Sequence, residues 1–194
     1  YAVRLKGHGT SIMELDKTKW REWYKDYENG YDELSKKTKK IFVAGHSLGG
    51  ALALYLAEQK DTAGVISIAS PTALKDKRAK LAWLIKYFRK YEERDLTEEK
   101  KLYHYDVFSA SAVEQLVSFL DTYKKDLVKI TEPVLIMQLS NDTRIEQSSA
   151  QYIYENINSK DKKLILINGT GHVLVEEPYL IEIQQEIYDF IKSR

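Results

Sequence analysis

The chain alternates between short apolar runs and longer stretches in which apolar residues recur every three or four positions. The apolar runs lie at residues 41–44, 64–70, 133–139 and 163–167. Continuous runs of this length are typical of strands buried on both faces, as in parallel sheets, and the longer spacing is that of amphipathic helices. The alternation predicts an α/β fold with a doubly wound, mostly parallel sheet.

The first predicted helix ends near Ser35, and Asp16 or Thr18 could cap its start. Its aromatic and apolar residues share one face: Trp20, Tyr24, Tyr27, Tyr31 and Leu34. Such a stripe could be a platform for a ligand, but one-faced periodicity is the usual sign of core contact, so we expect it to pack on the sheet. Upstream, residues 1–5 have the pattern of a strand end. Further helices are predicted after residue 47, near residues 146–156 and near residues 179–192.

Residues 73–130 interrupt the alternation with charged, helix-favouring sequence, notably at residues 75–80 and 91–101. We interpret this segment as a helical insertion between two strands of one domain, residues 1–194, whose core comprises residues 1–72 and 131–194. The apolar faces of the insertion must cover something. The carboxyl edge of the sheet, where α/β proteins bind their ligands, is the candidate.

Composition describes an ordinary globular chain of 194 residues, long enough for one domain with a sizeable core. The 30 Lys and Arg nearly balance the 29 Asp and Glu, so nothing in the charge indicates nucleic acid, and no apolar stretch is long enough to predict a membrane span. Cysteine is absent, which excludes disulfides and thiolate metal sites and fits a reducing cytosol; we expect a cytoplasmic protein. The sequence carries no signal for an oligomeric state.

Residues 41–58, IFVAGHSLGGALALYLAE, join an apolar run to helical sequence through a G-x-S-x-G pattern at residues 45–49. This is a nucleophile elbow in the strand-turn-helix context that the motif requires. A sharp turn leaves little room for side chains, and we expect Gly45 and Gly49 to remove clashes there. Ser47 would project from the turn, with the N–H of Leu48 as an oxyanion donor at the helix N-terminus. The alternative is a glycine-rich turn whose serine merely caps the helix.

Two other predicted strands end in residues that complement a serine nucleophile. Asp142 follows the run at 133–139, and His172 follows the run at 163–167. An imidazole takes the proton of a serine hydroxyl near neutral pH, and a carboxylate holds that imidazole in the required tautomer. The chain order Ser, Asp, His is also that of enzymes with this elbow. We therefore predict a catalytic triad of Ser47, His172 and Asp142.

Each residue also has an alternative assignment, since His172 could be a turn histidine and Asp142 a helix cap. The other histidines are weaker candidates for the general base. His46 is expected to point away from the Ser47 hydroxyl, His8 belongs to a loop, and His104 belongs to the insertion. The competing acids do not end an apolar run upstream of the histidine: Asp161, Glu176 and Glu177. The sequence contains no H-E-x-x-H pair, so it does not predict a metal site.

The motifs resemble the α/β-hydrolase family, most closely its small bacterial carboxylesterases and monoacylglycerol lipases with a helical lid. The matching segments are residues 6–9 (KGHG), 45–50 (GHSLGG), 141–142 (ND) and 170–173 (TGHV). The resemblance implies hydrolysis of short to medium acyl esters through an acyl-enzyme, without a cofactor. It also implies that residues 73–130 are a lid whose aromatic residues are candidates to line an acyl pocket or simply to pack: Trp83, Tyr87, Phe88 and Phe119.

Similar family members carry further strands and an oxyanion loop upstream of the KGHG segment, and nothing here matches that loop. We expect its N–H, the second oxyanion donor, to come from residues outside this chain, so that the 194 residues alone would be a poor catalyst. The sequence thus predicts a serine carboxylesterase acting on a small-molecule ester. The alternatives are a thioesterase or amidase on the same triad, and a non-catalytic binding protein that retains the fold.

Overall fold

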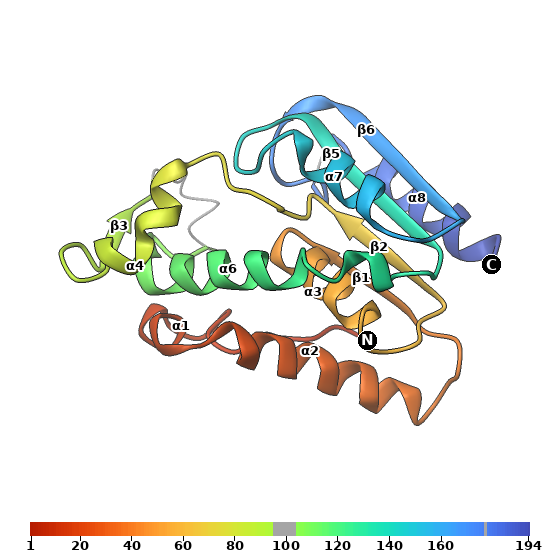
Figure 1. The fold of residues 1–194 in the computed structure, drawn as a ribbon, viewed down its shortest axis with the longest axis horizontal. Helices are drawn as coiled ribbons and strands as arrows, with labels where there is room; N and C mark the ends of the chain where they lie inside the picture. The colour runs from red at the N-terminus through yellow and green to blue at the C-terminus, as the bar shows by residue number, and fades with distance from the viewer. Residues whose placement is uncertain (95–103, 177) are drawn as a thin grey trace. The chain divides into compact units, whose positions relative to one another are not determined.

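The computed structural model describes residues 1–94, 104–176 and 178–194 (Figure 1). These residues form two compact units. One unit comprises Tyr1–Gly30 and Lys77–Phe119, and the other comprises Tyr31–Asp76 and Leu120–Arg194. Among the described residues, none of the helices combines the length and the apolar character needed to cross a membrane.

The second unit contains a four-stranded sheet in the order β1-β2-β5-β6. Its strands are β1 (Phe42–His46), β2 (Gly64–Ile68), β5 (Val134–Asp142) and β6 (Lys162–Gly171). All three neighbouring pairs are parallel, which confirms the predicted sheet. β5 and β6 extend past their apolar runs because they continue to pair, across an irregularity between Leu139 and Asn141, as far as Asp142 and Gly171.

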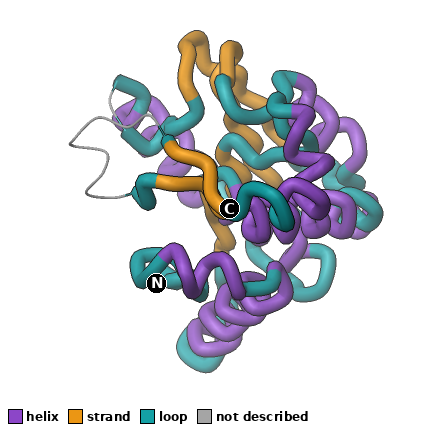
Figure 2. The backbone as a smooth tube through the Cα atoms, turned by 90° about the vertical axis from the view of Figure 1, so that its left-hand side faces the viewer, coloured by secondary structure: helices purple, strands orange, loops and turns teal. Residues whose placement is uncertain are grey.

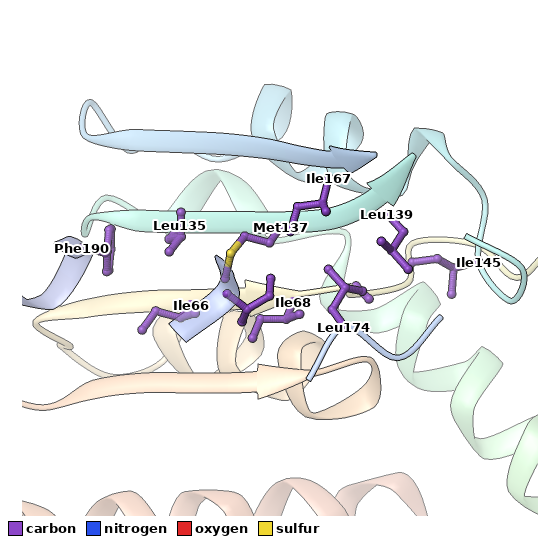
Figure 3. Close-up of a cluster of buried hydrophobic side chains, with 11 residues drawn as sticks. Ile66, Ile68, Leu135, Met137, Leu139, Ile145, Ile167, Leu174 and Phe190 are labelled. Atoms are coloured by element: carbon purple, nitrogen blue, oxygen red, sulfur yellow. The ribbon is translucent and has the colours of Figure 1, made fainter. Parts of the chain in front are cut away.

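Helices cover both faces of this sheet. On one face, Ile183 and Phe190 of α8 (Leu180–Lys192) join a buried cluster with strand residues such as Leu135 and Met137 (Figure 3). Gln138 follows Met137 in β5 and therefore faces the opposite side. There its amide oxygen accepts a hydrogen bond from the N–H of Ala150 in α7 (Ser148–Asn156), at 3.0 Å.

The alternation of strand and helix also includes α3 (Leu48–Ala57), which follows β1 and buries most of its residues. Figure 2 shows strands in orange and helices in purple. The short 3-10 helix η2 (Leu127–Lys129) precedes β5. The parallel strands, with α8 on one face and α7 on the other, confirm the doubly wound arrangement predicted from the apolar runs.

The first unit joins the N-terminal segment to much of the predicted insertion. It contains α1 (Ile12–Lys17), η1 (Lys77–Leu81), α4 (Ala82–Ile85), β3 (Tyr91–Glu93) and β4 (Val107–Ser109), together with most of α2 (Trp20–Ser35) and α6 (Ala110–Tyr123). Asp16 of α1 contacts the predicted insertion at two residues. It accepts a hydrogen bond from the hydroxyl of Ser109, at 2.7 Å, and forms an ion pair with Lys90, at 2.9 Å.

The structure corrects the purely helical interpretation of residues 73–130, because β3 and β4 pair as an antiparallel ribbon. Next to β3, the guanidinium carbon of Arg94 lies 4.5 Å from the ring centroid of Phe108 in β4, a cation–π contact between the two sides of the ribbon. Most of the charged stretch predicted to be helical at residues 91–101 lies outside the described residues.

The N-terminal predictions were partly wrong. Residues 1–5 form no strand, and within the described chain no strand pairs with them; the side chain of Val3 instead lies against Gly30 of α2. Asp16 does not cap α2, because it lies inside α1, and Thr18 is the C-cap of α1. α1 was missed, although Ser11 caps it by accepting a hydrogen bond from the N–H of Glu14.

The predicted aromatic stripe lies on α2, which ends at Ser35 as expected. Trp20 is buried, and its ring lies 5.3 Å from that of Phe119. The other members of the stripe are only partly buried. Packing of the stripe on the sheet stays a prediction.

Candidate active site

The elbow has the strained backbone that its motif predicts. Ser47 has φ 54° and ψ −120°, a conformation that costs a residue with a side chain of order 1–3 kcal/mol. Its N–H donates to the carbonyl of Ile68, at 2.7 Å, which ties the turn to β2. Its side chain makes no capping hydrogen bond to α3, so the alternative of a simple helix cap does not describe its hydroxyl.

The two motif glycines are not equivalent. A Cβ at Gly45 would collide with the backbone of Gly49 and Gly50 where α3 begins, so the close approach of strand and helix requires a glycine there. A Cβ at Gly49 would meet no atom of the described residues within 4 Å. The expectation that Gly49 removes a clash was therefore wrong. At Gly50, by contrast, a Cβ would collide with the hydroxyl of Ser70.

The three predicted side chains come together at the carboxyl ends of their strands. The Oγ of Ser47 lies 2.9 Å from Nε2 of His172, and Nδ1 of His172 lies 2.8 Å from Oδ2 of Asp142. Asp142 is the last residue of β5, and His172 directly follows β6. Because Oδ2 of a carboxylate only accepts, Nδ1 carries a proton and Nε2 is left to accept the serine proton.

Asp142 is completely buried, and its charge is stabilised by three donors. Its Oδ1 accepts hydrogen bonds from the N–H groups of Arg144, at 2.8 Å, and Ile145, at 3.0 Å. Burial raises the pKa of Asp142, but the hydrogen bonds from His172 and from these two backbone groups outweigh it and lower the pKa below its ordinary value. The same carboxylate thus shapes the turn after β5 and holds the imidazole.

The remaining predicted residues lie in distinct surroundings. Leu48 is the first residue of α3, so its N–H has no acceptor within the helix. Of the proposed pocket residues, Phe119 is fully buried beside Trp20, whereas Trp83, Tyr87 and Phe88 are largely exposed. Asp161, a competing acid, is ion-paired with Arg194, and Glu177 lies outside the described residues.

Sequence reasoning gave His46 no role, yet its ring lies beside that of His172. The ring centroids are 5.1 Å apart, and Nε2 of His46 lies 3.0 Å from the backbone oxygen of His172. Burial lowers the pKa of His46 below its ordinary value. The residue type was visible in the motif, but its partner lies 126 positions away in the sequence.

The model of the family described as serine aminopeptidase, S33, matches residues 1–179. Over 192 residues the chain is 28% identical to a thermostable monoacylglycerol lipase from Bacillus sp. (strain H-257), covering 95% of this chain and 77% of that protein. Over 200 residues it is 24% identical to a carboxylesterase from Bacillus subtilis (strain 168), covering 100% of this chain and 80% of that protein.

Solved structures give the same architecture. A chain solved in work on two metagenome-derived lipolytic enzymes has a TM-score of 0.88 at 22% identity, over 97% of this chain and 80% of that chain. A monoacylglycerol lipase from Paleococcus ferrophilus has a TM-score of 0.74 at 19% identity, over 91% of this chain and 77% of that chain. These likenesses confirm the predicted fold class.

Proposed function

Because the chain belongs to the serine aminopeptidase S33 family of α/β hydrolases, we propose that this esterase-type hydrolase cleaves carboxylic esters through an acyl-enzyme on Ser47. The observation that carries the proposal is the continuous chain of contacts from Ser47 through His172 to Asp142, at 2.9 and 2.8 Å. Those distances suit proton transfer from a hydroxyl to an oriented imidazole.

The proposed reaction has two halves. Oγ of Ser47 attacks the ester carbonyl carbon while Nε2 of His172 takes its proton; the bond to the alcohol oxygen then breaks, and His172 returns the proton to that oxygen. Water next attacks the acyl-enzyme, His172 takes a proton from the water, and the acid leaves as Ser47 regains its hydrogen. Asp142 stabilises the imidazolium in both halves, and the N–H of Leu48 stabilises the oxyanion.

Short to medium acyl esters, with monoacylglycerols among them, are the proposed substrates. The names of the two Bacillus relatives, a monoacylglycerol lipase and a carboxylesterase, support monoacylglycerols and carboxylic esters as substrates. The assignment of residues 73–130 as a lid belongs to the same proposal. The family description favours a second candidate, hydrolysis of amides on the same three residues.

Steady-state kinetics on the full-length protein test the proposal. The substrates are p-nitrophenyl esters of increasing chain length, a monoacylglycerol, an acyl thioester and an aminoacyl anilide. Ser47→Ala should abolish turnover of all of them, and Ser35→Ala, an exposed serine at the end of α2, should leave it unchanged. Ester turnover that survives Ser47→Ala would refute the proposal, and a preference for the anilide would favour the amidase.

A further inference from the structure

His46 makes a specific contact with the backbone of the proposed general base. It is the last residue of β1, immediately before Ser47, and its Nε2 lies 3.0 Å from the carbonyl oxygen of His172. A carbonyl oxygen can only accept, so Nε2 of His46 must carry the hydrogen. Two residues that are adjacent in the chain, His46 and Ser47, therefore hold the backbone and the ring of the same histidine.

The protonation state of His46 follows from its surroundings. Burial disfavours the imidazolium, and the neighbouring His172 acts in the same direction, whereas the hydrogen bond to the carbonyl and the charges of Asp142 and Glu176 oppose this. Burial is the largest of these effects, so the pKa is lowered. The neutral ring with hydrogen on Nε2 meets both requirements, and such a ring donates to His172 without adding a charge near the imidazolium that forms there during turnover.

The segment that carries His172 is irregular after β6, so no strand or helix hydrogen bonds among the residues that the structure describes fix residue 172. Upstream, Gly171 has φ 123° and its carbonyl accepts a hydrogen bond from the N–H of Thr143, at 2.7 Å. Downstream, the next anchor is the buried side chain of Leu174 (Figure 3). The hydrogen bond from His46 acts on residue 172 itself, between these two anchors.

We propose that His46 is a positioning residue, whose hydrogen bond to the His172 carbonyl sets the distance between the imidazole and the Ser47 hydroxyl. This inference rests on the proposed function. A shift of about 1 Å in a catalytic group can cost about 100-fold in rate. Removing the donor should therefore lower kcat about 10- to 100-fold. KM should change little, because the hydrogen bond positions His172 and is not itself a contact with the substrate.

The test compares His46→Leu, which removes the donor, with His46→Gln, whose amide nitrogen can occupy a place similar to that of Nε2. The matched control is Tyr31→Phe, which removes another hydrogen bond from a side chain to a backbone carbonyl, that of Asp61, remote from the triad. For each variant of the full-length protein, kcat, KM, the pH profile of kcat/KM and the rate of fluorophosphonate labelling are measured, with Tm as a check on folding.

We expect His46→Leu to lose kcat and labelling rate together, His46→Gln to recover most of both, and Tyr31→Phe to retain them even where Tm falls. The pH at the midpoint of the acidic limb should not move, since His172 remains the base. Activity of His46→Leu within twofold of wild type, or His46→Gln as impaired as His46→Leu, would overturn the positioning role. Loss of the acidic limb of the kcat/KM profile in His46→Leu would also overturn the positioning role, because His46 would then be the base. Failure of the proposed function is distinguishable, because wild type itself would then show no labelling at Ser47.

Discussion

Glu58, at the C-terminal end of α3, gives a quantitative prediction about stability. Both of its carboxylate oxygens are buried and accept no hydrogen bond from the described residues. Burial is the main reason that the pKa of Glu58 rises from 4.5 to about 9; Asp126 raises it further, and Lys129 lowers it by less. Glu58 is therefore protonated in the folded protein at pH 7 and ionised in the unfolded chain.

The sign of the effect follows from proton linkage. Between pH 4.5 and 9 the folded state binds one proton more than the unfolded state, so the free energy of unfolding falls as the pH rises through this window. From pH 4.5 to 7 the interval is 2.5 units, which at about 1.4 kcal/mol per unit amounts to about 3 kcal/mol. Glu58→Gln removes the ionisation while keeping the shape of the side chain.

Urea unfolding followed by circular dichroism at pH 5, 6, 7 and 8 measures this difference. Relative to wild type, Glu58→Gln should gain stability with each unit of pH, whatever constant offset the amide introduces. Glu33→Gln, at a half-exposed position on α2, is the control and should run parallel to wild type. Parallel curves for Glu58→Gln and wild type would refute the reasoning, because they would mean that Glu58 is ionised in the folded protein.

Three further predictions concern the acid and the elbow. Asp142→Asn should lower kcat about 10⁴-fold with little change in KM, measured by ester hydrolysis, because the His172 tautomer is then wrong. Folding lowers the pKa of Asp142 below its ordinary value of 3.8, so wild type should lose stability as the pH falls below 3.8. Asp142→Asn lacks this ionisation and should lose less stability in acid unfolding. Gly45→Ala should destabilise the protein by more than about 3 kcal/mol, because its Cβ meets backbone, whereas Gly49→Ala should be neutral or stabilise α3 by up to about 1 kcal/mol. Thermal unfolding of both variants decides this, and equal losses would contradict the distinction.

The apolar runs were sufficient to predict the four strands of the sheet. Burial along the whole run, which such runs typify, holds only for the central strands β2 and β5, whereas β1 and β6 are partly exposed among the described residues. The polar ends of β5 and β6 were not predictable from composition: Asp142 and Gly171 belong to strands only because they pair with each other. Helix α1 is short and lacks a buried residue, so periodicity missed it. Ser11 and Glu14 form the S-x-x-E start signal that could have revealed it.

The candidate site was predictable to the extent that its chemistry lies in residue types at strand ends. Ser47 was predicted from the elbow motif, and Asp142 and His172 from their places after apolar runs, because parallel strands place their carboxyl ends at one edge of the sheet. The structure brings these three side chains within hydrogen-bond distance of one another. The unequal roles of Gly45 and Gly49 depend on which atoms of α3 approach β1, and this the motif does not contain. The contact of His46 depends on a carbonyl far along the chain.

The most direct test of the account is to map the site of covalent labelling. The full-length protein is treated with a fluorophosphonate and digested, and the adduct is located by mass spectrometry. We predict one adduct, on Ser47, which is absent from Ser47→Ala and preserved in Ser35→Ala. An adduct on another residue, or undiminished labelling of Ser47→Ala, would contradict the assignment of Ser47 as the nucleophile.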